Sequence, residues 1–305
     1  MATVVPTTLE VAEELQIVGA DQLPEQVTLW QDAWRRLTRN RMAVIGMVII
    51  GFFLVTAVVS FVWTPYETWR QALGITYSGP SLAHPLGLDD YGRDILSRVM
   101  GGAGIALSVG VGASMVASAI GIILGLLAGF YRGKVDVLIS LLINISYGVP
   151  DLLIALILVV LIGRGIQNII LAISITAWLG MARLVRGQTL ALREREFVEA
   201  ARSIGTKNLK ILSRHILPNA LGPIVVQATY LVPAAIIFEA FLSLLGLGVP
   251  PPAPSWGRMA VEGYKAIQIA PHIVLAPCVA LSLTVLAFNW LGDGLRDAID
   301  PRMRR

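Results

Sequence analysis

The sequence predicts an all-α integral membrane protein with six transmembrane helices. Hydrophobic residues make up 55% of its 305 residues and charged residues only 14%, whereas a soluble domain carries about 25% charge. Six stretches with few or no Asp, Glu, Lys and Arg residues are long enough to cross the hydrocarbon core of a bilayer, which takes about 20 residues as a helix. These observations exclude a soluble globular domain.

The six predicted spans follow one another along the chain. They are residues 42–66, 99–131, 137–163, 165–182, 215–247 and 266–291. The third span joins two apolar runs, Val137–Pro150 and Leu152–Gly163, which Asp151 separates. We expect a kink there, because Pro150 cannot donate a backbone hydrogen bond.

Basic residues beside the spans predict how the chain is inserted. With six spans both termini lie on one side, and 18 of the 24 Lys and Arg residues lie on that side against six on the other. Because cytoplasmic loops carry an excess of Lys and Arg, we expect both termini to be cytoplasmic. The net charge of +4 does not indicate nucleic-acid binding, because the basic residues flank apolar runs and form no stripe with interleaved aromatics.

The chain before the first span has two parts. Residues 1–29 are predicted to be a cytoplasmic acidic tail and not a secretory signal, because they contain no Lys or Arg and no apolar run after a basic start. Trp30, Trp34 and Leu37 recur at helical spacing. We expect residues 28–41 to be either an amphipathic helix in the inner interface or an ordinary aromatic anchor at the membrane edge.

The remaining divisions follow from the spans. Residues 30–98 comprise the interfacial segment, the first span and an extracytoplasmic loop, residues 99–295 hold the other five helices, and residues 296–305 are a cytoplasmic basic tail. In the second span small residues recur every four positions, at Ala113, Ala117, Gly121, Gly125 and Gly129. This stripe predicts close helix packing, either within the chain or with a second subunit.

The one long polar cytoplasmic segment, Arg183–Arg214, lies between the fourth and fifth spans. A loop of this length is expected to be functional. Residues 194–203 lack Gly and Pro and predict a helix, which Gly205 would end and after which Thr206 would cap a second short helix. Pro218 falls in the first turn of the fifth span, where its missing N–H does no harm.

These residues also carry a resemblance to a known family. Glu199-Ala200-Ala201, followed after three residues by Gly205 and then by Leu217-Pro218, resembles the EAA loop of ABC-importer membrane subunits. His215 departs from the general pattern, although residues 214–219 read as they often do in the dipeptide/oligopeptide permease branch. Three further segments resemble that branch. They are residues 84–98, with Leu88 in place of the usual threonine, residues 241–257 and residues 291–301.

The resemblance, which runs from about Trp34 to the C-terminus, implies a type I ABC importer permease fold in the cytoplasmic (inner) membrane. Residues 99–295 would be its transmembrane core. The partners implied are a homologous second permease subunit, two cytoplasmic ATPase subunits and an extracytoplasmic solute-binding protein. The residues implied to couple the ATPases to the membrane helices are Glu199, Ala200, Ala201, Gly205, Leu217 and Pro218.

The sequence predicts no catalysis and no cofactor in this chain. It contains no G-x-x-x-x-G-K-[ST] loop, so ATP and magnesium must be bound by a partner. One cysteine, Cys278, and three scattered histidines offer no set of metal ligands. Asp151 and Asp293 are expected at different depths of the membrane, which argues against a paired-aspartate protease.

Asp151 and Glu239 are carboxylates inside predicted spans. Such groups are costly in a bilayer and suggest a function. Both are expected in the outer half, on the substrate path, where each would meet an ammonium group of the substrate. The alternative is that each is protonated or accepts hydrogen bonds from neighbouring helices.

We therefore expect an importer subunit for di- or oligopeptides. The same architecture also serves nickel, glutathione and oligosaccharides, which remain alternatives. An ion-coupled secondary transporter is the competing class of protein, followed by a channel or a structural scaffold.

Overall fold

A computed structural model describes residues 29–299 of the chain. This part is helical, and its one β-bridge joins Leu88 and Asp94. The helices are α2 (Leu29–Arg39), α3 (Arg41–Val62), α4 (Ile95–Tyr131), α5 (Gly133–Tyr147), α6 (Asp151–Ile162), α7 (Ile166–Arg193), α8 (Glu196–Ser203), α9 (Asn208–Ile211), α10 (Leu217–Leu244), α11 (Trp256–Tyr264) and α12 (His272–Ile299). The predicted acidic tail lies outside the described residues except for Leu29, and so does the basic tail beyond residue 299.

Five helices are long and apolar enough to cross a membrane, and a sixth span results if α5 and α6 count as one. The predicted all-α, six-span fold is confirmed, but several boundaries differ. α4 begins at Ile95 because Asp94 accepts a hydrogen bond from the Ser97 N–H at 2.8 Å. α3 begins at Arg41, since the side chain of Asn40 caps its first turn.

The predicted start of the last span at Ala266 is wrong. Residues 256–264 form a separate helix, α11, and the chain turns before α12 begins at His272. Ala266 and Ala270 are apolar because they are buried in the core beside α12, not because they belong to a span. The end at Leu291 is also wrong, since α12 continues to Ile299.

The predicted third span is sharply broken. α5 and α6 meet at 89°, far more than the kink expected from one proline. Gly148 ends α5, and Pro150 disfavours helical geometry at Val149. Asp151 is the first residue of α6. Each half is too short to cross a bilayer alone, so the break lies within the membrane-spanning part of the chain.

The small-residue stripe of α4 packs against α7 in the same chain, which decides between the two predicted partners. A Cβ at Gly121 would lie 2.6 Å from Cβ of Met181, and one at Gly125 would lie 2.7 Å from the carbonyl oxygen of Ala182. Ala113 and Ala117 are fully buried. Only residues without a larger side chain allow the two backbones to approach this closely.

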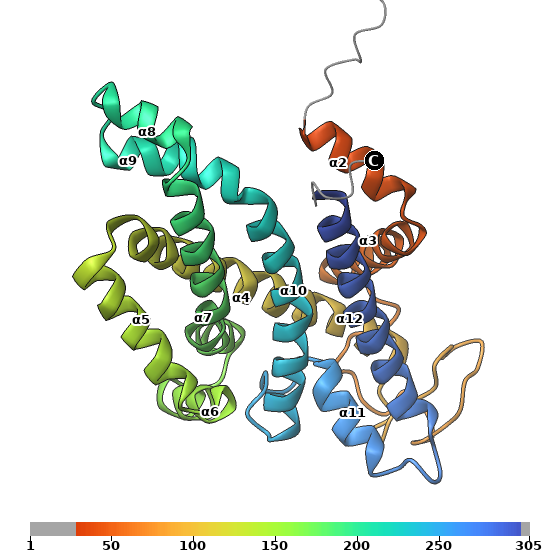
Figure 1. Ribbon diagram of the computed structural model, residues 1–305. Helices are drawn as coiled ribbons and strands as arrows, with labels where there is room; N and C mark the ends of the chain where they lie inside the picture. The colour runs from red at the N-terminus through yellow and green to blue at the C-terminus, as the bar shows by residue number, and fades with distance from the viewer. Residues whose placement is uncertain (1–28, 300–305) are drawn as a thin grey trace, which may run out of the picture.

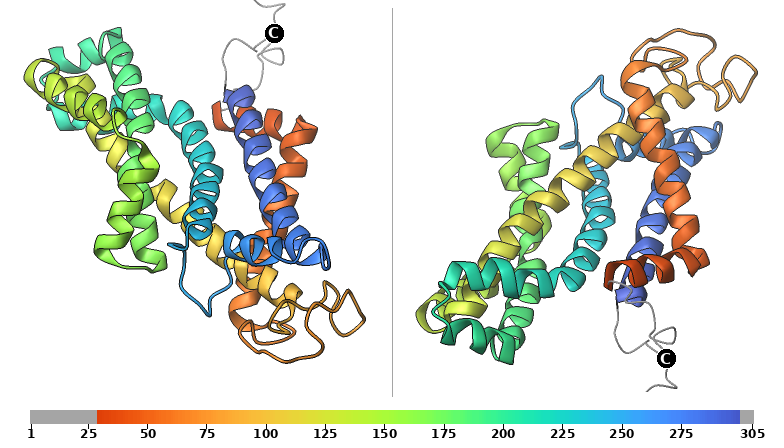
Figure 2. Two further views of the ribbon diagram at one scale, coloured as in Figure 1. Left: turned by 90° about the horizontal axis from the view of Figure 1, so that it is seen from below. Right: turned by 90° about the horizontal axis from the view of Figure 1, so that it is seen from above.

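The bundle has two distinct ends. Figure 1 shows α8, α9, α2 and the end of α12 on one side of the molecule, and α11 with the long loop before α4 on the other. The two further views show α4 running obliquely across the other helices (Figure 2). Six spans would place α2, the end of α12 and the segment of α8 and α9 on one side and the loop before α4 on the other, and this is the arrangement observed.

The segment before the first span forms the helix α2. Leu37 is buried against Ala43 and Ala298, whereas Trp34 is 61% exposed. α2 therefore has one face on α3 and α12 and one face away from the bundle. Its geometry fits the first of the two alternatives left open by the sequence, an amphipathic helix.

Candidate functional site

The first candidate site is the corner between α8 and α9. Gly205 has a φ of +77°, which glycine adopts without strain. Its N–H donates to the carbonyl of Arg202 at 2.9 Å, and the N–H of Thr206 donates to the carbonyl of Ala201 at 3.0 Å. This pair of bonds is the Schellman motif that ends helices. The predicted glycine corner is present.

Other details of the corner differ from prediction. Its first helix starts at Glu196 and not at Glu194. The predicted cap at Thr206 is wrong, because Lys207 precedes α9 and no side chain caps that helix. A helix of four residues gains little from a cap, and its fixed position comes from the burial of Ile211 instead.

The two faces of α8 have different roles. Val198 and Ala201 are buried in an apolar cluster, so Ala201 packs within the chain and is not available to a partner. Glu199 and Ala200 point outward and are exposed. Around them lie exposed apolar side chains, Phe197, Ile204 and Leu209. This outward face of the corner, residues 197, 199, 200, 204 and 209, is termed the coupling face below.

The corner is connected to three membrane helices. Phe130, at the end of α4, belongs to the apolar cluster that Val198 and Ala201 join. Arg193, the last residue of α7, donates a hydrogen bond to the carbonyl of Phe130. The corner is therefore packed against the ends of α4 and α7.

The third connection runs into α10. A π-helical turn, Leu212–Ile216, joins α9 to α10, and Pro218 lies in the first turn of α10 as predicted. Because proline removes one backbone hydrogen bond and clashes with the carbonyl four residues earlier, the helix widens just before it. Leu217 is half-buried beside this turn.

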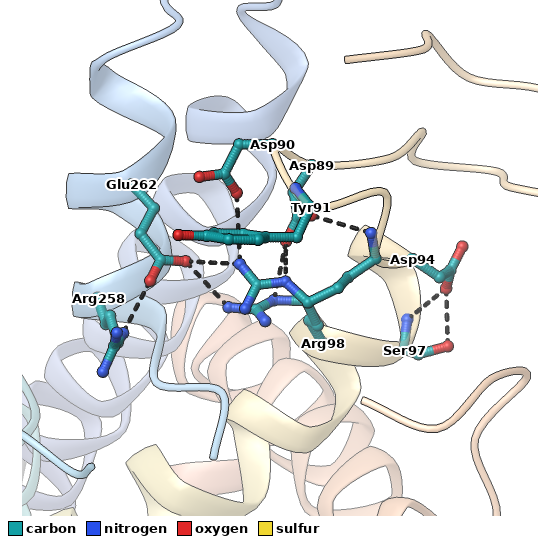
Figure 3. A network of polar contacts seen from close by, with 9 residues as sticks. Asp89, Asp90, Tyr91, Asp94, Ser97, Arg98, Arg258 and Glu262 are labelled. Carbon is teal, nitrogen blue, oxygen red and sulfur yellow. Dashed lines mark hydrogen bonds and ion pairs between the residues drawn. The ribbon is translucent and has the colours of Figure 1, made fainter. Parts of the chain in front are cut away.

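The second candidate site is a network of ion pairs at the opposite end (Figure 3). Glu262 of α11 accepts hydrogen bonds from Arg93, Arg98 and Arg258 at 3.1, 3.1 and 2.8 Å. Arg93 also binds Asp89 at 2.6 Å and lies 3.4 Å from Asp90. The network joins the loop before α4 to α11.

Charge in this network is balanced. The three carboxylates of Asp89, Asp90 and Glu262 lie within 4.8 Å of one another, and Arg93, Arg98 and Arg258 supply three positive charges. Burial raises the pKa of Glu262, but the hydrogen bond from Arg258 and the charges of Arg98 and Arg93 outweigh it and hold that pKa below its ordinary value. Burial and the neighbouring Asp89 raise the pKa of Asp90.

A hollow of about 390 Å³ opens beside the network. Its wall includes Asp90 and Tyr91 of the loop before α4, Arg164 of the turn between α6 and α7, and Glu262 and Lys265 at the end of α11. The end of α10 and the loop after it, residues 243–251, form another side. Volumes of about 300–1,000 Å³ are usual for small-molecule sites.

Glu239 is enclosed under that hollow. Its side chain is 2% exposed, and Oε1 accepts hydrogen bonds from Ser243 at 2.7 Å and Ser255 at 2.8 Å. Ser243 and Ser255 are themselves 3.1 Å apart. A Cβ at Gly248 would collide with Ser243, so the loop after α10 closes directly over this trio. Glu239 therefore accepts hydrogen bonds within the protein, which is the alternative to a role in binding substrate.

Asp151 is placed differently. It is exposed at the start of α6, and its side chain makes no hydrogen bond or ion pair with any residue from 29 to 299. Tyr147, at the other side of the break, lies under the guanidinium of Arg183 at 4.4 Å. The sequence places Glu239 and Asp151 in one class, but Glu239 is buried and Asp151 is exposed. The structure does not bring them into a single site.

The ion-pair network and the hollow were not identified from the sequence as functional. The run of charges from Asp89 to Arg98 and the spacing of Arg258 and Glu262 by one helical turn were the available signals. Neither signal reveals that residues 93 and 262 meet.

Comparison with known proteins gives consistent matches over nearly the whole chain. Residues 121–305 match the family model "Binding-protein-dependent transport system inner membrane component", and residues 28–80 match "N-terminal TM domain of oligopeptide transport permease C". The dipeptide transport system permease protein DppC of Bacillus subtilis (strain 168) is 44% identical over 90% of this chain and 86% of its own length.

Two further matches extend the comparison. The glutathione transport system permease protein GsiD of Escherichia coli O1:K1 / APEC is 44% identical over 92% of this chain and 93% of its own length. A chain of the MetNI methionine ABC transporter in an inward-facing conformation has a TM-score of 0.55 at 22% identity, covering 68% of this chain and 98% of that chain. At this identity the structural match shows the fold alone, which is that of a type I ABC importer permease.

Proposed function

The chain belongs to the family of binding-protein-dependent transport system inner membrane components and is a permease subunit of such an importer, and we propose that its substrates are di- or oligopeptides. The observation that carries the substrate proposal is the 44% identity to a dipeptide permease across 90% of the chain. The similar likeness to a glutathione permease makes glutathione, itself a small peptide, the second candidate.

The proposed complex contains this subunit, a homologous second permease subunit, two cytoplasmic ATPase subunits and an extracytoplasmic solute-binding protein. The chain lies in the cytoplasmic (inner) membrane with both termini and the coupling face in the cytoplasm. One feature supports this orientation. Basic residues are concentrated at the end that holds α2, α8 and α9 (Figure 1), and that is the side on which Lys and Arg accumulate.

The coupling face is proposed to dock on an ATPase subunit. Its exposed apolar side chains and the small Ala200 allow a helix corner to sit in a groove, while Glu199 offers a charge at the edge. Gly205 fixes the angle of the corner, and Leu217 and Pro218 carry its displacement into α10. Ala201 acts differently from Ala200, since it fixes α8 to Phe130.

ATP drives transport in this proposal by binding one arrangement of the ATPase pair more tightly than the other, because a ligand shifts an equilibrium only through such a difference in affinity. The chain itself binds no nucleotide and no cofactor, and hydrolysis takes place in the partner subunits. The chain transmits movement of the coupling face to α4, α7 and α10.

Asp151 is proposed to lie on the substrate path. An exposed carboxylate at a break within the membrane-spanning part is expensive unless it meets water, substrate or a partner. An ammonium group of a peptide is a matching ligand. Glu239 is assigned the structural role instead, because its hydrogen bonds to Ser243 and Ser255 hold the loop after α10.

The test is transport by the complete complex in proteoliposomes, assembled with the second permease subunit, both ATPases and the binding protein. We expect ATP-dependent accumulation of labelled dipeptides and tripeptides, and none when the binding protein is left out. Glutathione and an amino acid are measured in parallel. Accumulation of neither peptides nor glutathione would contradict the substrate proposal, and uptake without ATPase subunits would contradict the assigned class of transporter.

A further inference from the structure

The hollow beside the ion-pair network contains positive charge that no residue from 29 to 299 balances. Asp89, Asp90 and Glu262 are matched by Arg93, Arg98 and Arg258. Two more cations, Arg164 and Lys265, line the same hollow. Neither forms an ion pair with a carboxylate of residues 29–299. The hollow therefore has an excess of two positive charges.

The two unmatched cations are held at different parts of the wall. Arg164 lies between Gly163 and Gly165 in the turn that joins α6 to α7, and Asn168 fixes this turn by donating to the carbonyls of Ile162 and Gly163 at 2.9 and 3.1 Å. Lys265 directly follows α11, whose position the ion pairs of Glu262 determine. Both side chains are exposed, so they are open to a ligand.

The rest of the wall adds no competing anion. Asp90 and Glu262 are already bound by arginines, and Tyr91 lies against the guanidinium of Arg93 at 4.5 Å. The remaining side is the loop after α10, which Glu239, Ser243 and Ser255 hold from below. A small anionic group thus meets two free cations on a surface that is otherwise satisfied.

We propose that this hollow is a subsite for the carboxylate of a peptide substrate at the extracytoplasmic mouth of the permease, with Arg164 and Lys265 as its ligands. The guanidinium of Arg164 presents paired N–H donors that match the two oxygens of a carboxylate, and Lys265 adds a point charge. Its volume of about 390 Å³ accepts the end of a small peptide. The proposal rests on the proposed peptide function and names the group that this face of the chain recognises.

The experiment uses the complete transporter in lipid nanodiscs and in proteoliposomes, with trialanine and trialanine amide as probes. The variants are Arg164→Gln, Lys265→Gln and the double variant. The control is Arg70→Gln, which removes a positive charge from an exposed residue of the loop before α4, outside the hollow. Each complex is checked for assembly by size-exclusion chromatography.

Binding is measured first, by equilibrium dialysis of labelled trialanine against nanodiscs without the binding protein. Loss of a charge-assisted hydrogen bond weakens binding about tenfold or more, so we expect the double variant to bind trialanine at least about tenfold more weakly than wild type and Arg70→Gln. The amide should bind weakly to all of them. Equal binding of trialanine and its amide by wild type would overturn the subsite, as would absence of trialanine binding.

Uptake is measured second, as the ratio of the KM values for the amide and the free acid. The double variant should raise KM for trialanine and leave KM for the amide unchanged. A different result would be a parallel rise of both KM values, accompanied by a rise in the concentration of binding protein needed for half-maximal uptake. It would mean that the two cations serve docking of the binding protein, and the subsite would be refuted. If peptides are taken up and the variants bind and transport trialanine as wild type does, the subsite alone is refuted. Trialanine binding without any peptide uptake refutes the peptide function alone.

Discussion

The two faces of this permease subunit are held by different kinds of contact. The corner between α8 and α9 rests on an apolar cluster around Phe130, Val198 and Ala201 and leaves apolar side chains exposed on the coupling face. The opposite face, formed by α11 and the loop before α4, is fixed by ion pairs that converge on Glu262. Apolar packing is not directional, whereas charge-assisted hydrogen bonds fix both distance and angle. The difference indicates that the ion-pair face is held in one geometry more strictly than the apolar corner.

Loss of the charge at Glu262 should produce the largest effect. In Glu262→Gln the guanidinium groups of Arg93 and Arg98 lose their shared carboxylate, and breaking a buried pair costs about 3–5 kcal/mol. Partial exposure of Glu262, 18% of its side chain, lowers that figure. We expect a clear drop in the thermal denaturation midpoint of the purified complex. The control is Glu67→Gln, an exposed acid of the loop before α4, and equal shifts for both would show that the network does not hold this face.

A smaller and more selective effect is expected at Asp151, which lies between the two faces. Asp151→Asn removes charge with little change in shape. One charge-assisted hydrogen bond is worth about 1.5–3 kcal/mol, so uptake of a lysine-containing dipeptide should fall about tenfold or more relative to a neutral one. Rates are normalised to assembled complex. A parallel decline for both peptides would assign Asp151 to packing against a partner subunit.

At the corner between α8 and α9, Gly205→Val tests whether the fixed angle of these helices matters. A side chain in the left-handed region costs about 1–2 kcal/mol, and a Cβ added at Gly205 would meet no neighbouring atom within 4 Å. The angle should therefore change without a steric clash. We expect uptake to fall and substrate-stimulated ATPase activity to be lost, while the subunit still inserts. Gly187→Val is the matched control, because Gly187 is equally open but helical. Normal uptake by an assembled Gly205→Val complex would refute the coupling role.

The contribution of Glu262 to stability should also depend on pH. Its pKa in the folded protein lies below the ordinary 4.5, so its stabilising effect is complete above about pH 4.5 and is lost as the pH falls through the folded value. The difference in denaturation midpoint between wild type and Glu262→Gln should stay constant at neutral pH and shrink below pH 4.5. A difference that persists unchanged in acid would mean that shape, and not charge, is what the glutamine variant alters.

The smallest effect is expected from labels that place the two faces on opposite sides of the membrane. Ser203→Cys and Ser81→Cys, each in a Cys278→Ala background, replace exposed residues of the two faces and should leave transport unchanged. An impermeant thiol reagent should modify residue 81 from outside intact cells and residue 203 only after the membrane is opened. Modification of both from the same side would contradict the six-span topology.

Much of this architecture was predictable because it depends on local properties of the chain. Apolar runs predicted the membrane helices, since crossing a bilayer requires a minimum length of apolar helix. Gly205 predicted the corner because glycine readily occupies positive φ, whereas the coupling role inferred from the spacing of Glu199, Gly205 and Pro218 stays a prediction. The errors at Thr206 and Ala266 are local too: a cap and a span were inferred where burial of neighbouring residues decides the structure.

The tertiary structure alone decided which distant residues meet. It turned one predicted span into two helices at 89°, selected α7 as the partner of the α4 stripe, and buried Glu239 while leaving Asp151 exposed. It also brought Glu262 to Arg93 and Arg98, which lie more than 160 positions earlier in the sequence. Hydropathy and backbone sterics act over a few residues and can be read from the sequence. Contacts between residues that are distant in the sequence depend on how whole helices pack.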